Sequence, residues 1–158
     1  MPSDTQAMAH RLHSSKVEYL GIAAAAEALC EELVKEQEVE IDFHQTGVPT
    51  QLPHEVSLCL FRVLQEALSN ALKHSGARRV KVELTGTVKE VELIVSDAGQ
   101  GFDSEDAMKG PGLGLVSMRE RVHLVEGELS IHSQPSCGAT ERVRVPLRSE
   151  QSLAAGAD

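Results

Sequence analysis

The sequence predicts a single α+β domain in which a β-sheet packs against helices. Apolar residues recur at helical spacing in three segments and alternate at strand spacing in five others. Four of these strands come in adjacent pairs between helices, which favours antiparallel hairpins over a doubly wound parallel sheet. With 158 residues, 41% of them hydrophobic, the chain is long enough to bury one core.

The first half of the chain predicts two helices with a strand between them. An alanine-rich helical pattern covers residues 13–38, and residues 39–44 alternate apolar and polar side chains like a half-buried strand. A second helix is expected between Pro53, a favourable first residue, and Gly76, a common stop. Its apolar stripe consists of Val56, Leu60, Val63, Leu64, Ala67, Leu68, Ala71 and Leu72.

The second half predicts two hairpins separated by a helix. Gly86-Thr87 predicts a tight turn inside the first hairpin. A helix is expected to open at Gly112 and to bury Leu115, Met118 and Val122. The four strands are expected over residues 79–85, 88–96, 127–133 and 140–147.

Charge and composition exclude several classes of function. The net charge of −9 disfavours nucleic acid and anionic membranes, which require a basic surface. An anionic nucleotide remains compatible, because backbone dipoles and a bound cation act locally. There is no apolar run long enough to span a membrane and no signal-peptide pattern. Cys30, Cys59 and Cys137 show no metal-ligand spacing and predict reduced thiols in a cytoplasmic protein.

Four polar residues accompany the apolar stripe of the second helix. Asn70 lies four positions after Glu66, and the adjacent Lys73 and His74 lie three and four positions after Asn70, which places all four along one side of a regular helix. A carboxylate, an amide oxygen, an ammonium and an imidazole in one row are suited to a metal ion and phosphate oxygens. The alternative is an ordinary solvated face of an amphipathic helix.

Two glycine motifs follow. Asp97-x-Gly99-x-Gly101 ends a predicted strand and would let a planar ligand approach a carboxylate, although a plain strand-ending turn has the same pattern. Gly112-x-Gly114-Leu115 opens a predicted helix, whose free N–H groups suit a phosphate, although a glycine hinge is the alternative. The spacing fits neither the Rossmann nor the Walker A pattern.

In this order, the three motifs resemble the N, G1 and G2 boxes of the GHKL ATP-binding superfamily, which includes histidine kinases, gyrase, Hsp90 and MutL. The resemblance implies the Bergerat fold, a two-layer α/β sandwich with a mixed, mostly antiparallel sheet. Within the superfamily, the segments QEALSNALKHSGA and GLGLVSMRER look like the catalytic domain of sensor histidine kinases of the NarL-partnered class.

The resemblance also implies a role for each motif residue, with ATP and Mg²⁺ as cofactors. Asn70 would ligate Mg²⁺, Asp97 would accept the adenine amino hydrogen, and Glu66 would act as a base or orient a metal-bound water. The positions implied in nucleotide binding are Asn70, Lys73, His74, Asp97, Gly99, Gly101, Gly112, Gly114 and Leu115. Residues 102–111 would form the lid.

The implied domain organisation has three parts. Residues 1–37 resemble the end of the dimerisation and phosphotransfer helices, residues 38–148 the ATP-binding domain, and residues 149–158 a disordered tail. Neither His10 nor His13 has the acidic neighbour of a phosphoacceptor. We therefore expect a C-terminal piece of a longer kinase, with its acceptor histidine elsewhere and little autophosphorylation of its own.

The expected partners are ATP or ADP, the phosphoacceptor helix of the same full-length kinase and a NarL-type response regulator. The segment itself is expected to be cytoplasmic and monomeric, without contact to membrane or nucleic acid, whether or not the full-length protein is membrane-anchored. Two alternatives remain at this point: a nucleotide-binding docking module without turnover, and a protein serine kinase of the anti-sigma type.

Overall fold

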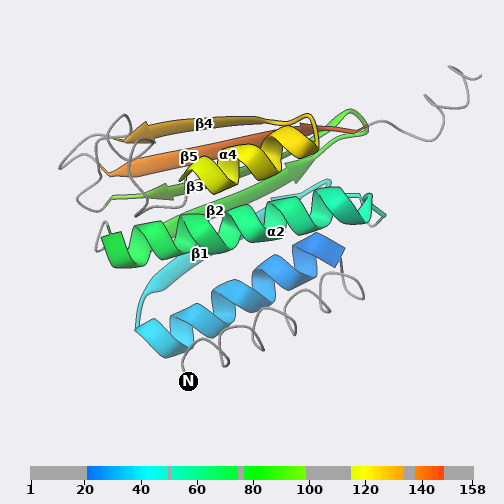
Figure 1. The fold of residues 1–158 in the computed structure, drawn as a ribbon. Helices are drawn as coiled ribbons and strands as arrows, with labels where there is room; N and C mark the ends of the chain where they lie inside the picture. The colour runs from blue at the N-terminus through cyan, green and yellow to red at the C-terminus, as the bar shows by residue number, and fades with distance from the viewer. Residues whose placement is uncertain (1–20, 50, 75–76, 99–114, 134–137, 148–158) are drawn as a thin grey trace, which may run out of the picture.

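One five-stranded sheet and a layer of helices make up the structure. The computed structural model describes residues 21–49, 51–74, 77–98, 115–133 and 138–147. Figure 1 shows the helices packed together on one side of the sheet. Three segments form this layer: a helix described over residues 21–37, α2 (His54–Ser69) with the π-helical turn η1 (Asn70–His74), and α4 (Leu115–Leu124). The predicted tail lies outside the described residues.

The sheet is mixed and mostly antiparallel, as the sequence predicted. Its spatial order is β1-β2-β3-β5-β4. Only the pair β1 and β2 is parallel, and the other neighbours run antiparallel. The strands are β1 (Glu40–Thr46), β2 (Arg79–Gly86), β3 (Glu90–Asp97), β4 (Glu128–Ser133) and β5 (Ala139–Pro146).

The turn between β2 and β3 differs from the predicted one. Gly86 pairs with Val91, and the backbone N–H of Thr87 donates to the carbonyl oxygen of Glu90 at 2.9 Å, so the turn lies at Val88-Lys89 and not at Gly86-Thr87. The Thr87 side chain explains this difference, because its Oγ1 accepts hydrogen bonds from the backbone N–H groups of Lys89 and Glu90, each at 3.1 Å. A side-chain acceptor of this kind gives the backbone an alternative to the strand ladder.

The core lies between α2 and the sheet. Leu60, Leu64 and Leu68 of α2 are each at most 1% exposed, and the helix contacts both β3 and β5. Each such side chain contributes about 1.5–3 kcal/mol by leaving water. The sheet side of the core consists of Val80, Val82, Leu84, Val91, Leu93, Val95, Val143 and Val145.

The opposite face of the sheet carries charged pairs. Glu92 of β3 contacts Arg144 at 3.1 Å and Arg142 at 3.8 Å, both from β5. Glu40 of β1 and Arg79 of β2 form a further pair at 2.9 Å. These side chains are partly or largely exposed, so the pairs add little stability, and they mark this face as the solvent side of a two-layer domain.

Two of the three cysteines lie within the described residues. Cys30 and Cys59 are buried free thiols. Burial raises the pKa of Cys30 to about 12 and that of Cys59 to about 11, which keeps both thiols protonated and unreactive. Cys137 lies outside the described residues.

In the part of the chain that the structure describes, no helix has the length and apolar character needed to cross a membrane.

Gly138, the residue just before β5, is a point of close backbone approach. Its φ is +77°, and a Cβ at this position would collide with the backbone carbonyl oxygen of Asp97. A glycine therefore lets the start of β5 lie against the end of β3. The sequence analysis did not single out this residue.

We predict that Gly138→Ala lowers the free energy of unfolding by about 1–3 kcal/mol, because alanine disfavours this φ and displaces the Asp97 carbonyl. Urea unfolding measures the change. Val88→Ala is the control, since Val88 is 82% exposed and should lose less than about 0.5 kcal/mol. Equal midpoints for Gly138→Ala and wild type would contradict the close approach.

Candidate functional site

The second helix changes its geometry where its polar residues begin. After Ser69 the chain continues as the π-helical turn η1, and the backbone N–H of Asn70 is shared between the carbonyl oxygens of Glu66 and Ala67. Asn70 is buried, with 2% of its surface exposed, whereas Glu66 and Lys73 are exposed. The predicted polar row therefore differs in exposure along its length, because Asn70 turns into the protein. Short π-helical turns often occur at functional sites.

Asn70 contacts a buried carboxyl group from the far end of the chain. Its Nδ2 donates a hydrogen bond to Oε1 of Glu141 at 3.4 Å. Glu141 is 4% exposed and lies in β5, opposite Val95 of β3 and Ile131 of β4. The contact joins residues 71 positions apart, so it ties the end of α2 to the middle of the sheet.

The electrostatics around Glu141 reveal which residues surround it. Burial raises the pKa of Glu141 to about 7; the hydrogen bond from Asn70 opposes this rise, and the negative charges of Asp97 and Glu66 reinforce it. Its second oxygen, Oε2, has no hydrogen-bond partner in the described part of the chain. Asn70 thus contacts this buried acid, and the charges of Asp97 and Glu66 act on it.

Asp97 ends β3 on the same face as Glu141. It pairs with Ala139 of β5, and Glu141 lies two positions further along that strand. Because side chains in a strand alternate, residues 139 and 141 share a face. The Asp97 side chain is partly exposed, in contrast to Glu141. The sheet register therefore brings the carboxylate of the second motif next to the amide of the first.

The structure places the other predicted residues as follows. Leu115 is the first residue of α4 and is buried in the core. Lys73 is exposed on η1, and of His74 only its backbone place in η1 is described. Gly99, Gly101, Gly112, Gly114 and the proposed lid over 102–111 lie outside the described residues. The described site is thus the side formed by α2, β3 and β5.

Sequence reasoning missed Glu141, although a signal for it exists. In β5 the residues at 141, 143 and 145 point toward the helices, and the last two are buried valines. An acidic residue in that inward series breaks the alternation expected of a half-buried strand. Such a break indicates a buried polar group, which needs a partner or a role.

The oxygen atoms around this site suit a hard cation. Amide and carboxylate oxygens are the ligands that Mg²⁺ prefers, and the neighbouring carboxyl groups supply a negative field. Within the described ranges there is no group of three or more His, Cys, Asp or Glu side chains that could hold a metal.

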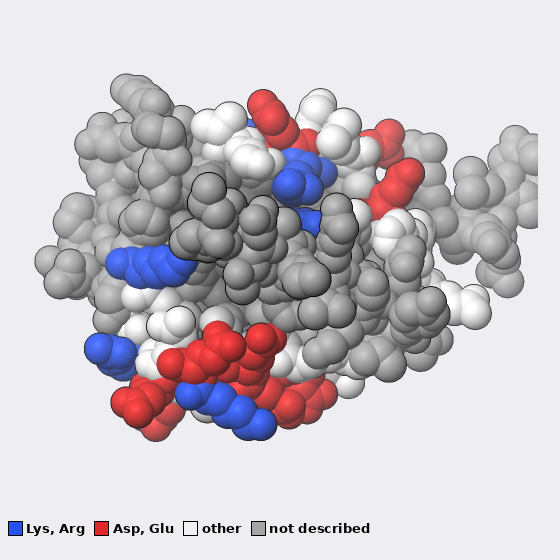
Figure 2. All heavy atoms as spheres, turned by 60° about the horizontal axis from the view of Figure 1, so that its bottom comes forward, with Lys and Arg blue, Asp and Glu red and all other residues white. Residues whose placement is uncertain are grey.

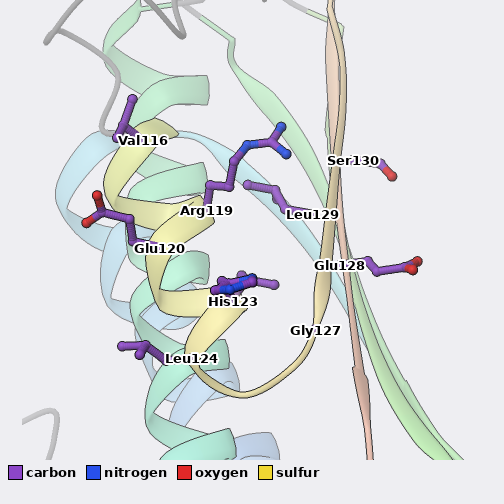
Figure 3. A pocket seen from close by; sticks show the side chains of 10 residues that line it. Val116, Arg119, Glu120, His123, Leu124, Gly127, Glu128, Leu129 and Ser130 are labelled. Atoms are coloured by element: carbon purple, nitrogen blue, oxygen red, sulfur yellow. The ribbon is translucent and has the colours of Figure 1, made fainter.

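A separate hollow lies between α4 and β4. It encloses about 830 Å³. Figure 3 shows Arg119 and His123 reaching from α4 toward β4, while Leu129 points from β4 toward the helix. Among the described residues, none of those predicted to bind ligand lines it. The lining consists of Val116, Arg119, Glu120, Val122, His123, Leu124, Gly127, Glu128, Leu129 and Ser130.

The raised pKa of Glu141 predicts a specific pH dependence of stability. Below 4.5, the ordinary pKa of a glutamate, the group is protonated in both states and contributes no difference. As pH rises toward 7, the unfolded state loses the proton first, so the folded state becomes less stable. Glu141→Gln removes this titration. Its free energy of unfolding relative to wild type should rise by about 2–3 kcal/mol between pH 5 and pH 8.

Urea unfolding of both proteins at the two pH values measures this difference. Glu92→Gln removes a carboxylate from the solvent side of the sheet and should show no comparable rise. A constant difference between Glu141→Gln and wild type across this pH range would contradict a buried acid with a raised pKa.

Comparison with known proteins agrees with this arrangement. The family described as "Histidine kinase-, DNA gyrase B-, and HSP90-like ATPase" matches residues 55–149. The histidine-protein kinase/phosphatase DegS of Brevibacillus brevis is 35% identical over 111 residues, which is 70% of this chain and 28% of DegS. The oxygen sensor histidine kinase NreB of Staphylococcus carnosus is 33% identical over 144 residues, 91% of this chain and 42% of NreB.

Solved structures show the same fold. A histidine kinase domain from the Erythrobacter litoralis EL346 blue-light activated kinase matches with a TM-score of 0.64 at 22% identity, covering 87% of this chain and 65% of that chain. The catalytic domain of histidine kinase ThkA matches with a TM-score of 0.63 at 18% identity, covering 80% of this chain and 90% of that one. These likenesses confirm the predicted two-layer architecture.

The chain spans less than half the length of DegS and NreB. The family match itself covers residues 55–149 of 158, including η1 with Asn70 and β5 with Glu141. The predicted GHKL resemblance is therefore confirmed: this chain belongs to the family of histidine kinase-, DNA gyrase B- and HSP90-like ATPases.

Proposed function

We propose that this chain is the ATP-binding catalytic domain of a two-component sensor histidine kinase, which presents the γ-phosphate of ATP to a histidine outside this chain. One observation carries the proposal. Asn70 from η1 and Asp97 from the end of β3 converge on the same buried carboxyl group, Glu141. Two motifs 27 residues apart in the sequence therefore lie together, as a shared nucleotide site requires.

In this proposal Asp97 binds the base. Its carboxylate is partly exposed at the end of a strand whose backbone is fixed by β2 on one side and β5 on the other. A carboxylate held in this way accepts a hydrogen bond from the adenine amino group and discriminates against bases without one. Gly99 and Gly101 follow it directly and would shape the pocket.

The phosphate side would use the polar end of the second helix. Asn70 would contribute an oxygen ligand to Mg²⁺, Lys73 and His74 would contact phosphate oxygens, and Glu66 would orient a metal-bound water or act as a base. Bound Mg²⁺ would neutralise phosphate charge during transfer. Gly112, Gly114 and Leu115 would place the N-terminus of α4 near the phosphates.

The surrounding protein follows from the same proposal. Residues 1–37 would belong to the dimerisation and phosphotransfer region, and residues 38–148 to the catalytic domain. The acceptor histidine would come from the same full-length kinase, and a NarL-type response regulator would receive the phosphoryl group. Since the residues beside His10 and His13 would not activate either, this cytoplasmic and monomeric segment would autophosphorylate little. The relatives DegS and NreB are named as histidine kinases, which does not favour a docking module or a serine kinase.

The acidic surface fits a nucleotide better than a nucleic acid. Glu27, Glu31 and Asp42 surround a second hollow, of about 620 Å³, between the helix over 21–37 and β1, with Lys35 beside them. Figure 2 shows acidic side chains gathered at the lower edge of one face of the molecule. Such a negative field repels a polyanion such as nucleic acid. A single nucleotide needs only local contacts, such as those proposed for Asp97, Asn70 and Lys73.

Calorimetric titration with a non-hydrolysable ATP analogue and Mg²⁺ tests the proposal. We expect Asp97→Asn to weaken binding about 10- to 100-fold, because it disturbs a specific hydrogen bond with the base. Asn70→Ala should lose the part of the affinity that depends on Mg²⁺. Asp42→Asn, an exposed change on β1, serves as the charge-matched control and should bind like wild type.

Wild-type protein that fails to bind the analogue at millimolar concentration would contradict the proposed function. Equal affinities of wild type and Asp97→Asn would contradict the assigned base contact. A phosphohistidine formed on His10 or His13 of the isolated chain, and lost in the matching His→Gln variant, would contradict the external acceptor.

A further inference from the structure

We propose that Glu141 is a positioning residue for Asn70. By accepting the hydrogen bond from Nδ2, it would hold the amide so that its oxygen, Oδ1, is left for the metal and phosphate side of the site. This inference rests on the proposed function and assigns a role to a residue outside the three motifs.

The chemistry of an amide explains why such a partner matters. The Asn70 side chain has a donor end, NH₂, and an acceptor end, C=O, and rotation about one bond exchanges them. A metal ligand must present the oxygen, so a rotation that presents NH₂ to a cation abolishes the interaction. The bond from Nδ2 to Oε1 of Glu141 at 3.4 Å fixes which end faces the sheet. In many proteins, a side chain that hydrogen-bonds to a metal ligand orients that ligand in this way.

Glu141 can play this part in either protonation state. An ionised carboxylate offers two acceptor oxygens, and the neutral acid keeps its carbonyl oxygen as an acceptor. Only the buried amide donates to Oε1 in the described part of the chain, while Oε2 has no partner there. The positioning contact therefore does not require a particular charge on Glu141.

Neighbouring strands hold Glu141 in a fixed position. β5 is an inner strand, and the backbone around Glu141 is held by β3 through Val95 and by β4 through Ile131. The side chain is 4% exposed, and the other inward positions of β5 are the apolar residues Ala139, Val143 and Val145. A buried carboxyl group lowers stability compared with an apolar residue at such a position. The presence of this carboxyl group is explained if it positions Asn70 to bind ligand.

The test compares the Mg²⁺ dependence of nucleotide affinity in wild type, Glu141→Leu and Glu141→Gln. The measured ratio is the dissociation constant of the ATP analogue in EDTA divided by that in Mg²⁺. Leucine fills the space but accepts no hydrogen bond, so this ratio should fall about 10-fold or more. Glutamine keeps a carbonyl oxygen and should restore the ratio to within about twofold of wild type. Glu92→Gln is the surface control.

A second readout needs no ligand. The side-chain amide of Asn70 gives its own ¹H–¹⁵N NMR signals, which report directly on the hydrogen bond to Glu141. These signals should shift and exchange faster with water in Glu141→Leu, but less so in Glu141→Gln. If Glu141→Leu does not fold, Glu141→Met, which is also apolar and close in length to glutamate, replaces it in both experiments.

The outcomes separate this inference from the proposed function. Wild-type protein without Mg²⁺-dependent nucleotide binding overturns the proposed function and the inference with it. Wild-type protein with such binding, together with an unchanged ratio and unchanged Asn70 signals in Glu141→Leu, overturns the positioning role alone. A lowered ratio in Glu141→Leu that glutamine restores supports it.

Discussion

Burial of the α2 stripe against the sheet is the constraint on which the rest of the structure depends. Leu60, Leu64 and Leu68 leave almost no surface exposed and fix the helix across β3 and β5. This packing places the next turn of the chain directly above the inner strands. The π-helical geometry at Asn70 then turns a polar side chain downward into the sheet layer. Apolar packing therefore determines the positions of the candidate site residues.

The acidic residues of the candidate site lower the stability of the domain. Glu66, Asp97 and Glu141 place three carboxyl groups near one another, and burial raises the pKa of the innermost one. Acids gathered in this way repel each other, which lowers the stability of the ligand-free domain. Under the proposed function, a bound cation and the donors of a nucleotide would relieve the same repulsion. The site would then gain more from its ligand than a neutral pocket would.

Much of the fold followed from periodicity, because strands and helices bury different faces at different intervals. The inward valines of β2, β3 and β5 gave strong alternation, and the α2 stripe gave a clear helical period. Two features depend on contacts distant in sequence and could not be read in this way: the parallel pairing of β1 with β2 and the partner of Glu141. The π turn at Asn70 departs from the regular helical period on which such a reading relies. Asp97 and Asn70 belong to separate sequence motifs, and the register of β3 with β5 together with the Asn70–Glu141 hydrogen bond places them on the same side of the sheet.

The most direct test is a crystal structure of the chain with a non-hydrolysable ATP analogue and Mn²⁺, whose anomalous signal locates the metal. The account predicts the metal ligated by Oδ1 of Asn70, with Nδ2 still on Glu141 and the adenine amino group on Asp97. A nucleotide bound elsewhere, such as in the hollow between α4 and β4, or an Asn70 side chain that presents Nδ2 to the phosphates, would contradict it.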